Sequence, residues 1–231
     1  MSQQQEQGVE AYKTDNPFGR RCFVTVGATA SFYRLLEEIL SADFLDFLGA
    51  KGFAELLVQT GPDQDAVQTR MRQLTEERQQ TSSRWPAVKT FSYTADIPSA
   101  MVPCRGRVGE RRPGVVISHA GSGSILDTVR MDIPLVVVAN GALLGNHQEE
   151  LAEAVQTAGW AIKGELGRLQ DAVERAVENA DLDLLAGRFR QPEPDQFPIA
   201  ESERSGLFDW AAVAASSCGL PAPEATLVQL D

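Results

Sequence analysis

The sequence is poor in the residues that build disulfide frameworks and metal centres. Its 231 residues include three cysteines, Cys22, Cys104 and Cys218, which lie far apart without a C-x-x-C pair, and only two histidines. Such spacing predicts neither a disulfide-stapled fold nor a zinc site. We therefore expect reduced thiols and no bound metal.

Basic residues and long apolar runs are also scarce. Lys and Arg number 21 against 32 Asp and Glu, which gives a formal net charge of −11 at pH 7. This balance argues against nucleic acid or an anionic membrane as a direct partner, because both are held through basic side chains. No run approaches the ~20 apolar residues of a membrane span, and the polar opening lacks the apolar centre of a secretory signal. We expect no direct membrane insertion, so membrane association would come through a partner or a lipid substrate.

The most informative stretch covers residues 115–151 and contains both histidines, His119 and His147. It has the pattern of a strand, a glycine-rich turn, a helix, a second strand, a polar loop and a further helix. Earlier in the chain, a short apolar strand over 22–26 ends at Gly27. Alternating strands and helices predict an α/β fold, a Rossmann-like parallel sheet with helices on both faces, in which ligands bind at the carboxyl ends of the strands.

The chain is long enough for one substantial domain. A helix is expected directly after the first strand, with Ser31 as its cap, and further elements include an edge strand over 160–162 and a helix from about 166 to 179. The expected organisation is a disordered leader (1–19), the α/β domain (20–180), a surface linker (181–206), a C-terminal helix for packing or a partner interface (207–217) and a tail (218–231).

The turn after the 115–117 strand packs two glycines and three serines ahead of a helix expected to begin at Ile125. Gly121, Ser122, Gly123 and Ser124 can bring backbone N–H groups close to a phosphate, which the positive end of the helix dipole favours. The turn matches neither the dinucleotide fingerprint nor a P-loop. A phosphate-facing role and a plain tight turn both remain open.

Two further features of this block have two interpretations each. Ser124 and Asp127 have the spacing of a capping box, which the residues alone favour, but Asp127 is also placed to accept hydrogen bonds from ribose hydroxyls. His119 is either a satisfied, partly buried histidine or a donor to phosphate or a catalytic base.

At the start of the last helix in the block, Asn146 can be explained as an N-cap. His147 and Gln148 are less easily explained by capping, and together with Asn146 they could grip ribose or sugar hydroxyls. The Asp181-Leu182-Asp183 triplet matches the D-x-D pattern of metal-dependent glycosyltransferases. It lies at the end of a polar helix, however, so we expect these carboxylates to be exposed to solvent. The basic loop over 105–112 is read in the same way, although it could help to hold a diphosphate.

Four motifs together resemble the catalytic subunit of the two-part UDP-N-acetylglucosamine transferase of dolichol-linked oligosaccharide assembly. They occur in the family's order and spacing, and the resemblance covers about residues 21–215: FVTVGAT (23–29), VISHAGSGSILD (116–127), PLVVV (134–138) and NHQ (146–148).

The resemblance implies the C-terminal, donor-binding half of a GT-B glycosyltransferase, with UDP-N-acetylglucosamine as donor substrate and no cofactor. In a bacterial relative of this family, an acidic residue at the position of Asp127 holds the ribose, and a glutamine near Gln148 reaches the donor sugar. The resemblance therefore favours Asp127 as a ligand. The expected donor site comprises Gly27 with the 121–124 turn, Asp127 and the 146–148 segment. His119 is a candidate catalytic base, and a residue of the partner chain is equally possible.

The family reaction adds the second N-acetylglucosamine, β1,4-linked, to N-acetylglucosaminyl-diphosphodolichol on the cytosolic face of the endoplasmic reticulum. It implies a membrane-anchored partner subunit that binds the dolichol-linked acceptor, and a chain that is cytoplasmic and reaches the membrane peripherally. Two rival readings are a soluble glycosyltransferase with a small acceptor and a non-catalytic subunit that binds nucleotide sugar and regulates its partner.

Overall fold

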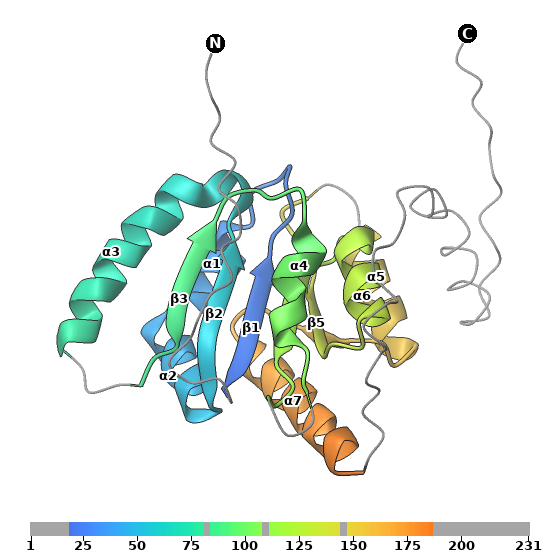
Figure 1. Ribbon diagram of the computed structural model, residues 1–231. Coiled ribbons are helices and arrows are strands. Elements are labelled where there is room, and N and C mark those ends of the chain that lie inside the picture. Colours follow the sequence, from blue (N-terminus) through green and yellow to red (C-terminus); the bar gives the residue numbers. More distant parts are fainter. Residues whose placement is uncertain (1–18, 81–83, 108–110, 144–146, 187–231) are drawn as a thin grey trace, which may run out of the picture.

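The computed structural model describes residues 19–80, 84–107, 111–143 and 147–186. These residues form a single parallel sheet with helices packed against it (Figure 1). The strands are β1 (Arg20–Thr25), β2 (Phe53–Gln59), β3 (Ala87–Phe91), β4 (Val115–His119), β5 (Leu135–Val138) and β6 (Ile162–Gly164). The helices are α1 (Tyr33–Ile39), α2 (Ala42–Ala50), α3 (Gln64–Gln80), α4 (Ile97–Met101), α5 (Ser122–Arg130), α6 (His147–Thr157) and α7 (Leu169–Leu185), with short 3-10 turns η1 (Gly61–Asp63) and η2 (Val102–Cys104).

The strand order is β3-β2-β1-β4-β5-β6, and every neighbouring pair is parallel. The chain first builds outward from β1 to β3, then crosses back to β4 on the other side of β1 and builds outward again to β6. This is the doubly wound order of dinucleotide-binding folds, and it confirms the expected Rossmann-like α/β class. The reversal of direction lies between β1 and β4.

Two hydrophobic cores cover the two faces of the sheet. Successive residues of β1 alternate between them: Cys22 and Val24 pack with α1, α2, α3 and α7, whereas Phe23 packs with α4, α5 and α6. All three side chains are at most 1% exposed. Burial on both faces explains why the centre of this strand is a continuous apolar run without the polar alternation of a half-exposed strand. Each large buried side chain contributes roughly 1.5–3 kcal/mol, so these residues anchor β1 in the sheet.

The segment after β1 differs from the single helix expected from its periodicity. Two helices, α1 and α2, are separated at Leu40 and Ser41, and Ser31 caps neither of them. Ser41 caps α2 instead, since its hydroxyl accepts a hydrogen bond from the Phe44 amide at 3.2 Å. Ser31 donates its hydroxyl to Asp63. The apolar spacing predicted the buried face correctly, but a serine able to restart the helix decided where the break falls.

At the other edge of the sheet, two boundaries lie later in the chain than expected. The edge strand β6 begins at Ile162, and α7 continues to Leu185, so residues 181–185 are helical instead of belonging to a linker. The predicted leader, C-terminal helix and tail lie outside the described residues. None of the described helices combines the length and hydropathy needed to span a membrane.

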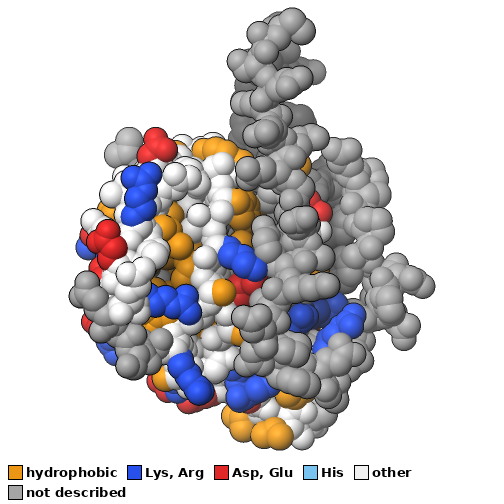
Figure 2. Space-filling model, turned by 60° about the vertical axis from the view of Figure 1, so that its left-hand side comes forward, with side chains coloured by type: hydrophobic (Ala, Val, Ile, Leu, Met, Phe, Trp, Pro, Cys, Tyr) orange, Lys and Arg blue, Asp and Glu red, His pale blue; other side chains and the backbone are white. Residues whose placement is uncertain are grey.

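On the side that carries α3 and β3, the described surface mixes charge types. Figure 2 shows Lys and Arg side chains there set among acidic and apolar ones. Some of this charge is neutralised locally, as in the ion pair of Lys89 with Glu55 at 2.7 Å.

Candidate donor site at the strand-order reversal

The carboxyl ends of β1 and β4 lie side by side where the strand order reverses. Thr25 of β1 pairs with Ser118 of β4, so the two strands end level with each other. The Gly27 turn follows β1 and the Gly121 turn follows β4. In open α/β sheets ligands bind in the crevice outside this point, so the fold places both predicted glycine turns where a ligand is expected.

The imidazole of His119, the last residue of β4, fills the space between these turns. A Cβ built on Gly27 would stand 2.7 Å from His119 Nε2, and a Cβ built on Gly121 would stand 2.4 Å from the same atom. Gly27 also has φ +83°, a conformation that favours glycine. The two glycines are therefore required for the turns to close on the ring.

The hydrogen bond of His119 defines the role of each ring nitrogen. Nδ1 lies 3.4 Å from the Thr25 carbonyl oxygen, and because a carbonyl only accepts, Nδ1 carries the proton and Nε2 is the acceptor. Burial lowers the pKa of His119 below its ordinary value, and the bond to Thr25 offsets this in part. The ring is neutral at pH 7, and its unprotonated nitrogen faces the two turns.

Helix α5 begins earlier than its apolar pattern suggested. Ser122 is its first residue, and Gly121 is the N-cap, with no side-chain cap bond. The Ile125 amide is the first to bond back into the helix, to Gly121 O at 3.2 Å. The amides of Ser122, Gly123 and Ser124 precede it, and such first-turn N–H groups have no intrahelical partner. A Cβ on Gly123 would meet nothing within 4 Å, so this part of the turn is open.

The capping-box interpretation of Ser124 and Asp127 is wrong. Ser124 is the third residue of α5 and Asp127 the sixth, so neither can occupy the cap position. The Ser124 carbonyl instead accepts the Thr128 hydroxyl at 2.7 Å. Half-buried Asp127 lies one turn beyond Ser124 on the same side of the helix. Its ribose-binding interpretation stays a prediction.

The start of α6 contributes one predicted residue to the architecture of the site. Gln148 Oε1 accepts the backbone amide of Asn140, just beyond β5, at 2.8 Å. His147 points away, with a side chain 94% exposed that lies 3.8 Å from Glu150. Asn146 lies outside the described residues. The structure therefore brings Gln148 to the carboxyl edge of the sheet but does not turn His147 towards it.

Two buried amides that the sequence interpretation missed also lie at this edge. Gln59 ends β2 and is 3% exposed, and Asn140 follows β5 and is 7% exposed. Gln59 donates to Gly27 O at 2.9 Å, and Asn140 donates to Ser31 O at 2.9 Å. In the sequence, the one feature that points to these two residues is a polar side chain at or just after the end of an apolar strand. Only the order of the strands in the sheet shows which loop each side chain reaches.

The described residues contain no group of three or more His, Cys, Asp and Glu side chains arranged to hold a metal ion. Asp181, from the triplet considered as a metal motif, lies on α7 and forms ion pairs with Arg20 and Arg112. The two described cysteines are buried, and burial raises the pKa of Cys104 to about 12. A protonated buried thiol is a poor nucleophile or ligand, so neither cysteine offers chemistry here.

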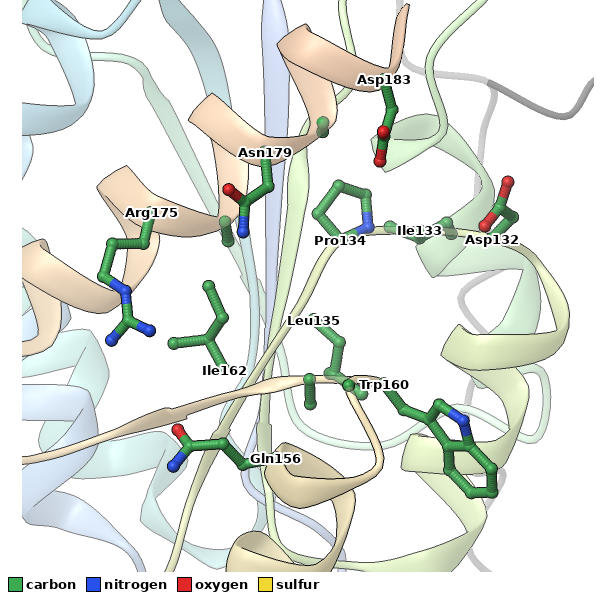
Figure 3. Close-up of a pocket in the computed structure, with 14 residues that line it drawn as sticks. Asp132, Ile133, Pro134, Leu135, Gln156, Trp160, Ile162, Arg175, Asn179 and Asp183 are labelled. Carbon is green, nitrogen blue, oxygen red and sulfur yellow. The ribbon is translucent and has the colours of Figure 1, made fainter. Parts of the chain in front are cut away.

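A separate hollow of about 370 Å³ lies at the opposite end of the sheet. Figure 3 shows Leu135 and Ile162, at the amino ends of β5 and β6, across from Asn179 and Asp183 of α7. It includes none of the predicted site residues. Because parallel sheets bind ligands beyond the carboxyl ends of their strands, the reversal between β1 and β4 is the stronger candidate.

The chain is similar in sequence to proteins of one glycosyltransferase family. The glycosyltransferase family 28 C-terminal domain matches residues 21–193. The UDP-N-acetylglucosamine transferase subunit ALG13 of Candida glabrata is 34% identical over 158 residues, which cover 59% of this chain and 76% of that protein. The protein of the same name from Saccharomyces cerevisiae is 32% identical over 154 residues, 60% of this chain and 74% of its own length.

Among solved structures, the NMR structure of ALG13 aligns with 82% of this chain and 95% of its own, at 24% identity and a TM-score of 0.46. The fold assignment rests on the strand order described above and not on this score. The family match confirms both the resemblance seen in the sequence and the expected glycosyltransferase class. The chain therefore belongs to the glycosyltransferase family 28 C-terminal domain family.

Proposed function

We propose that this chain binds UDP-N-acetylglucosamine at the reversal between β1 and β4 and supplies the donor half of a two-chain transferase. The acceptor is N-acetylglucosaminyl-diphosphodolichol, and the product carries a second, β1,4-linked N-acetylglucosamine. The observation that carries the proposal is the meeting of the Gly27 and Gly121 turns with the first turn of α5, in a chain of this glycosyltransferase family.

The first turn of α5 supplies the diphosphate contacts. The amides of Ser122, Gly123 and Ser124 and the serine hydroxyls are hydrogen-bond donors, and the positive end of the helix dipole faces the same direction. Dipole effects are worth about 0.3–1 kcal/mol when exposed and up to ~2 kcal/mol when partly buried, so several donors must act together. These donors stabilise the negative charge that develops on the diphosphate as UDP departs, so no metal ion is needed to neutralise it.

Asp127 and the 146–148 segment bind the rest of the donor. Asp127 accepts hydrogen bonds from the ribose hydroxyls, one turn along α5 from the diphosphate. Gln148 already lies at the carboxyl edge through its bond to the Asn140 amide, and it contacts the donor sugar. The side chain of His147 faces solvent in this structure, so it must turn towards the edge to join Gln148.

Transfer proceeds with inversion, through in-line attack of the acceptor 4-hydroxyl on the anomeric carbon and departure of UDP. An inverting step needs a base for the hydroxyl proton, as in inverting glycosidases. His119 is the candidate within this chain, because it is neutral and its Nε2 is an acceptor. A base supplied by the partner chain is the alternative.

The acceptor half comes from a membrane-anchored partner that holds the dolichol-linked substrate. The two relatives compared above are called subunits, which supports a partner for this chain. We place the chain at the cytosolic face of the endoplasmic reticulum, held there by the partner.

Transfer assays with a short-chain diphospholipid acceptor test the proposal. The purified chain should bind UDP and UDP-N-acetylglucosamine by calorimetry but transfer sugar only when the membrane partner is co-expressed. Binding without transfer under both conditions would indicate a regulatory subunit. Transfer to a small soluble acceptor by the chain alone would indicate a self-sufficient enzyme, and absence of nucleotide binding would refute the donor site.

A further inference from the structure

The buried side chain of Gln59 closes a ring of hydrogen bonds around one residue of the donor site. The Gly27 amide donates to the Thr25 hydroxyl at 3.4 Å, and that hydroxyl donates to Gln59 Oε1 at 2.5 Å. Gln59 Nε2 donates back to the Gly27 carbonyl at 2.9 Å. Both polar backbone groups of Gly27 are thus fixed through one glutamine.

The orientation of the Gln59 amide follows from its neighbours. Nε2 faces two carbonyl oxygens, that of Gly27 and that of Ser92 at 3.3 Å. Carbonyl oxygens cannot donate, so a flipped amide would place its oxygen against both of them. Gln59 therefore ties the ends of β1, β2 and β3 together.

The surrounding chain is shaped to let Gly27 reach this glutamine. Gly61 follows β2 with φ +54°, and a Cβ built on it would stand 2.6 Å from Gly27 O. A side chain at position 61 would push the carbonyl away from Gln59. The Gly27 carbonyl therefore lies close to Gln59 and to Gly61, and only glycine fits at position 61.

The same pattern recurs along the β1–α1 loop, residues 26–32. The Ala28 carbonyl accepts the Tyr93 hydroxyl at 3.2 Å, and the Ser31 carbonyl accepts Asn140 Nδ2 at 2.9 Å. Three carbonyls of one loop are therefore bound by side chains from three different strand ends.

Fixing the carbonyls also fixes the direction of the amides. In a trans peptide unit the C=O and the following N–H point in opposite directions. The Ser31–Phe32 unit shows this, since its carbonyl faces Asn140 and its amide donates to Asp63 at 3.0 Å. By the same geometry, a Gly27 carbonyl held on Gln59 turns the Ala28 amide outward, away from the sheet.

We infer that Gln59 is a positioning residue of the donor site, which holds the Gly27 carbonyl beneath the loop so that the loop presents amides, and not carbonyl oxygens, to an anionic donor. The inference rests on the proposed function for the identity of the ligand. The arrangement of the loop itself stands on the hydrogen bonds of the apo chain. Without Gln59, the peptide unit after Gly27 is free to rotate and place a carbonyl dipole against the diphosphate.

The test replaces Gln59 with methionine, which is close in size and shape but makes none of these hydrogen bonds. Glu55→Gln is the matched control, because Glu55 is buried in the same strand but at its amino end, where it pairs with Lys89. Gln59→Glu is the second variant if the methionine chain does not fold, since it keeps the acceptor for the Thr25 hydroxyl. Melting temperatures verify that each variant is folded.

Two measurements are made on each folded chain: UDP affinity by calorimetry and amide hydrogen exchange over residues 26–32. We expect the Gln59→Met chain, which loses all three side-chain hydrogen bonds of Gln59, to bind UDP roughly tenfold or more weakly and to exchange faster in this loop. Glu55→Gln should match the wild type in both measurements after allowance for any change in melting temperature.

Wild-type exchange rates in the loop of the Gln59 variant would overturn the inference, and so would wild-type UDP affinity in that variant. If the wild-type chain itself binds neither UDP nor the sugar nucleotide, the proposed function fails. The exchange measurement still decides the role of Gln59 in that case, because it needs no ligand: faster exchange supports positioning and unchanged exchange refutes it.

Discussion

Replacing Gly121 with alanine should destabilise the chain through a specific clash with His119. The new Cβ would stand 2.4 Å from Nε2 and 2.8 Å from Cε1, closer than real Cβ contacts occur. The same ring nitrogen also lies close to the other turn, since a Cβ built on Gly27 would stand 2.7 Å from it, and this limits where the ring can move. Overpacking of this kind costs about 1–3 kcal/mol, which lowers the melting temperature of a chain of this size by about 2–12 °C.

Gly123→Ala is the matched control, two residues away in the same turn. A Cβ at Gly123 meets nothing within 4 Å and lies inside α5, so alanine should leave stability unchanged or raise it by up to ~1 kcal/mol. The two substitutions remove the same conformational freedom from the unfolded chain. Opposite shifts in melting temperature therefore isolate the clash.

A double-mutant cycle with His119→Ala tests the cause directly. Removing the ring should relieve the Gly121→Ala clash, which gives a favourable coupling free energy of about 0.5–3 kcal/mol. Thermal denaturation of the four chains, with and without UDP, measures both stability and nucleotide binding. Additive effects of the two substitutions, or a stable Gly121→Ala chain, would show that the ring does not pack between the turns.

Further predictions concern pH, the ribose contact and the α7 ion pair. Burial lowers the pKa of folded His119 below its ordinary 6.5, so just below pH 6.5 the unfolded chain binds more protons and the free energy of unfolding falls as the pH decreases. His119→Gln should flatten this dependence in urea titrations at pH 7.5, 6.5 and 5.5. The same pH dependence in the variant and the wild type would contradict the prediction. Asp127→Asn should weaken UDP binding by about 10–100-fold, which is the loss expected for one hydrogen bond to a charged group, but it should hardly change the affinity for 2′,3′-dideoxy-UDP. An equal loss of affinity for both nucleotides would show that Asp127 does not bind the ribose hydroxyls. Asp181→Ala removes the carboxylate that pairs with the 2%-exposed Arg20, and it should lower the free energy of unfolding by about 1–3 kcal/mol. UDP affinity and its response to EDTA should stay unchanged, and a UDP affinity that depends on metal in the wild type but not in the variant would restore the metal interpretation.

The α/β class and the neighbourhood of the site were predictable because they follow from local patterns. Apolar runs of strand length alternate with helical spacing, and glycines follow the strands that end at Thr25 and His119. A parallel sheet forces such turns to the same edge. The position of His119 at a strand end was predicted on this basis and is confirmed.

Helix starts were less predictable, because competing local hydrogen bonds decide them. α5 begins at Ser122 and not at Ile125, which removes the capping box and adds three first-turn amides to the turn. Ser41 caps α2, whereas Ser31 was expected to cap the helix before it. Periodicity marks the buried face of a helix but is silent about its polar first turn.

The sequence alone determined the strands, the amphipathic helices and the family motifs, since each depends on residues close together in the chain. Only the tertiary structure decided that Gln59, Tyr93 and Asn140 hold one loop, that His119 fits between Gly27 and Gly121, and that His147 faces solvent. Most of these contacts join residues tens of positions apart. They depend on the strand order β3-β2-β1-β4-β5-β6, which brings distant strand ends together at one edge of the sheet.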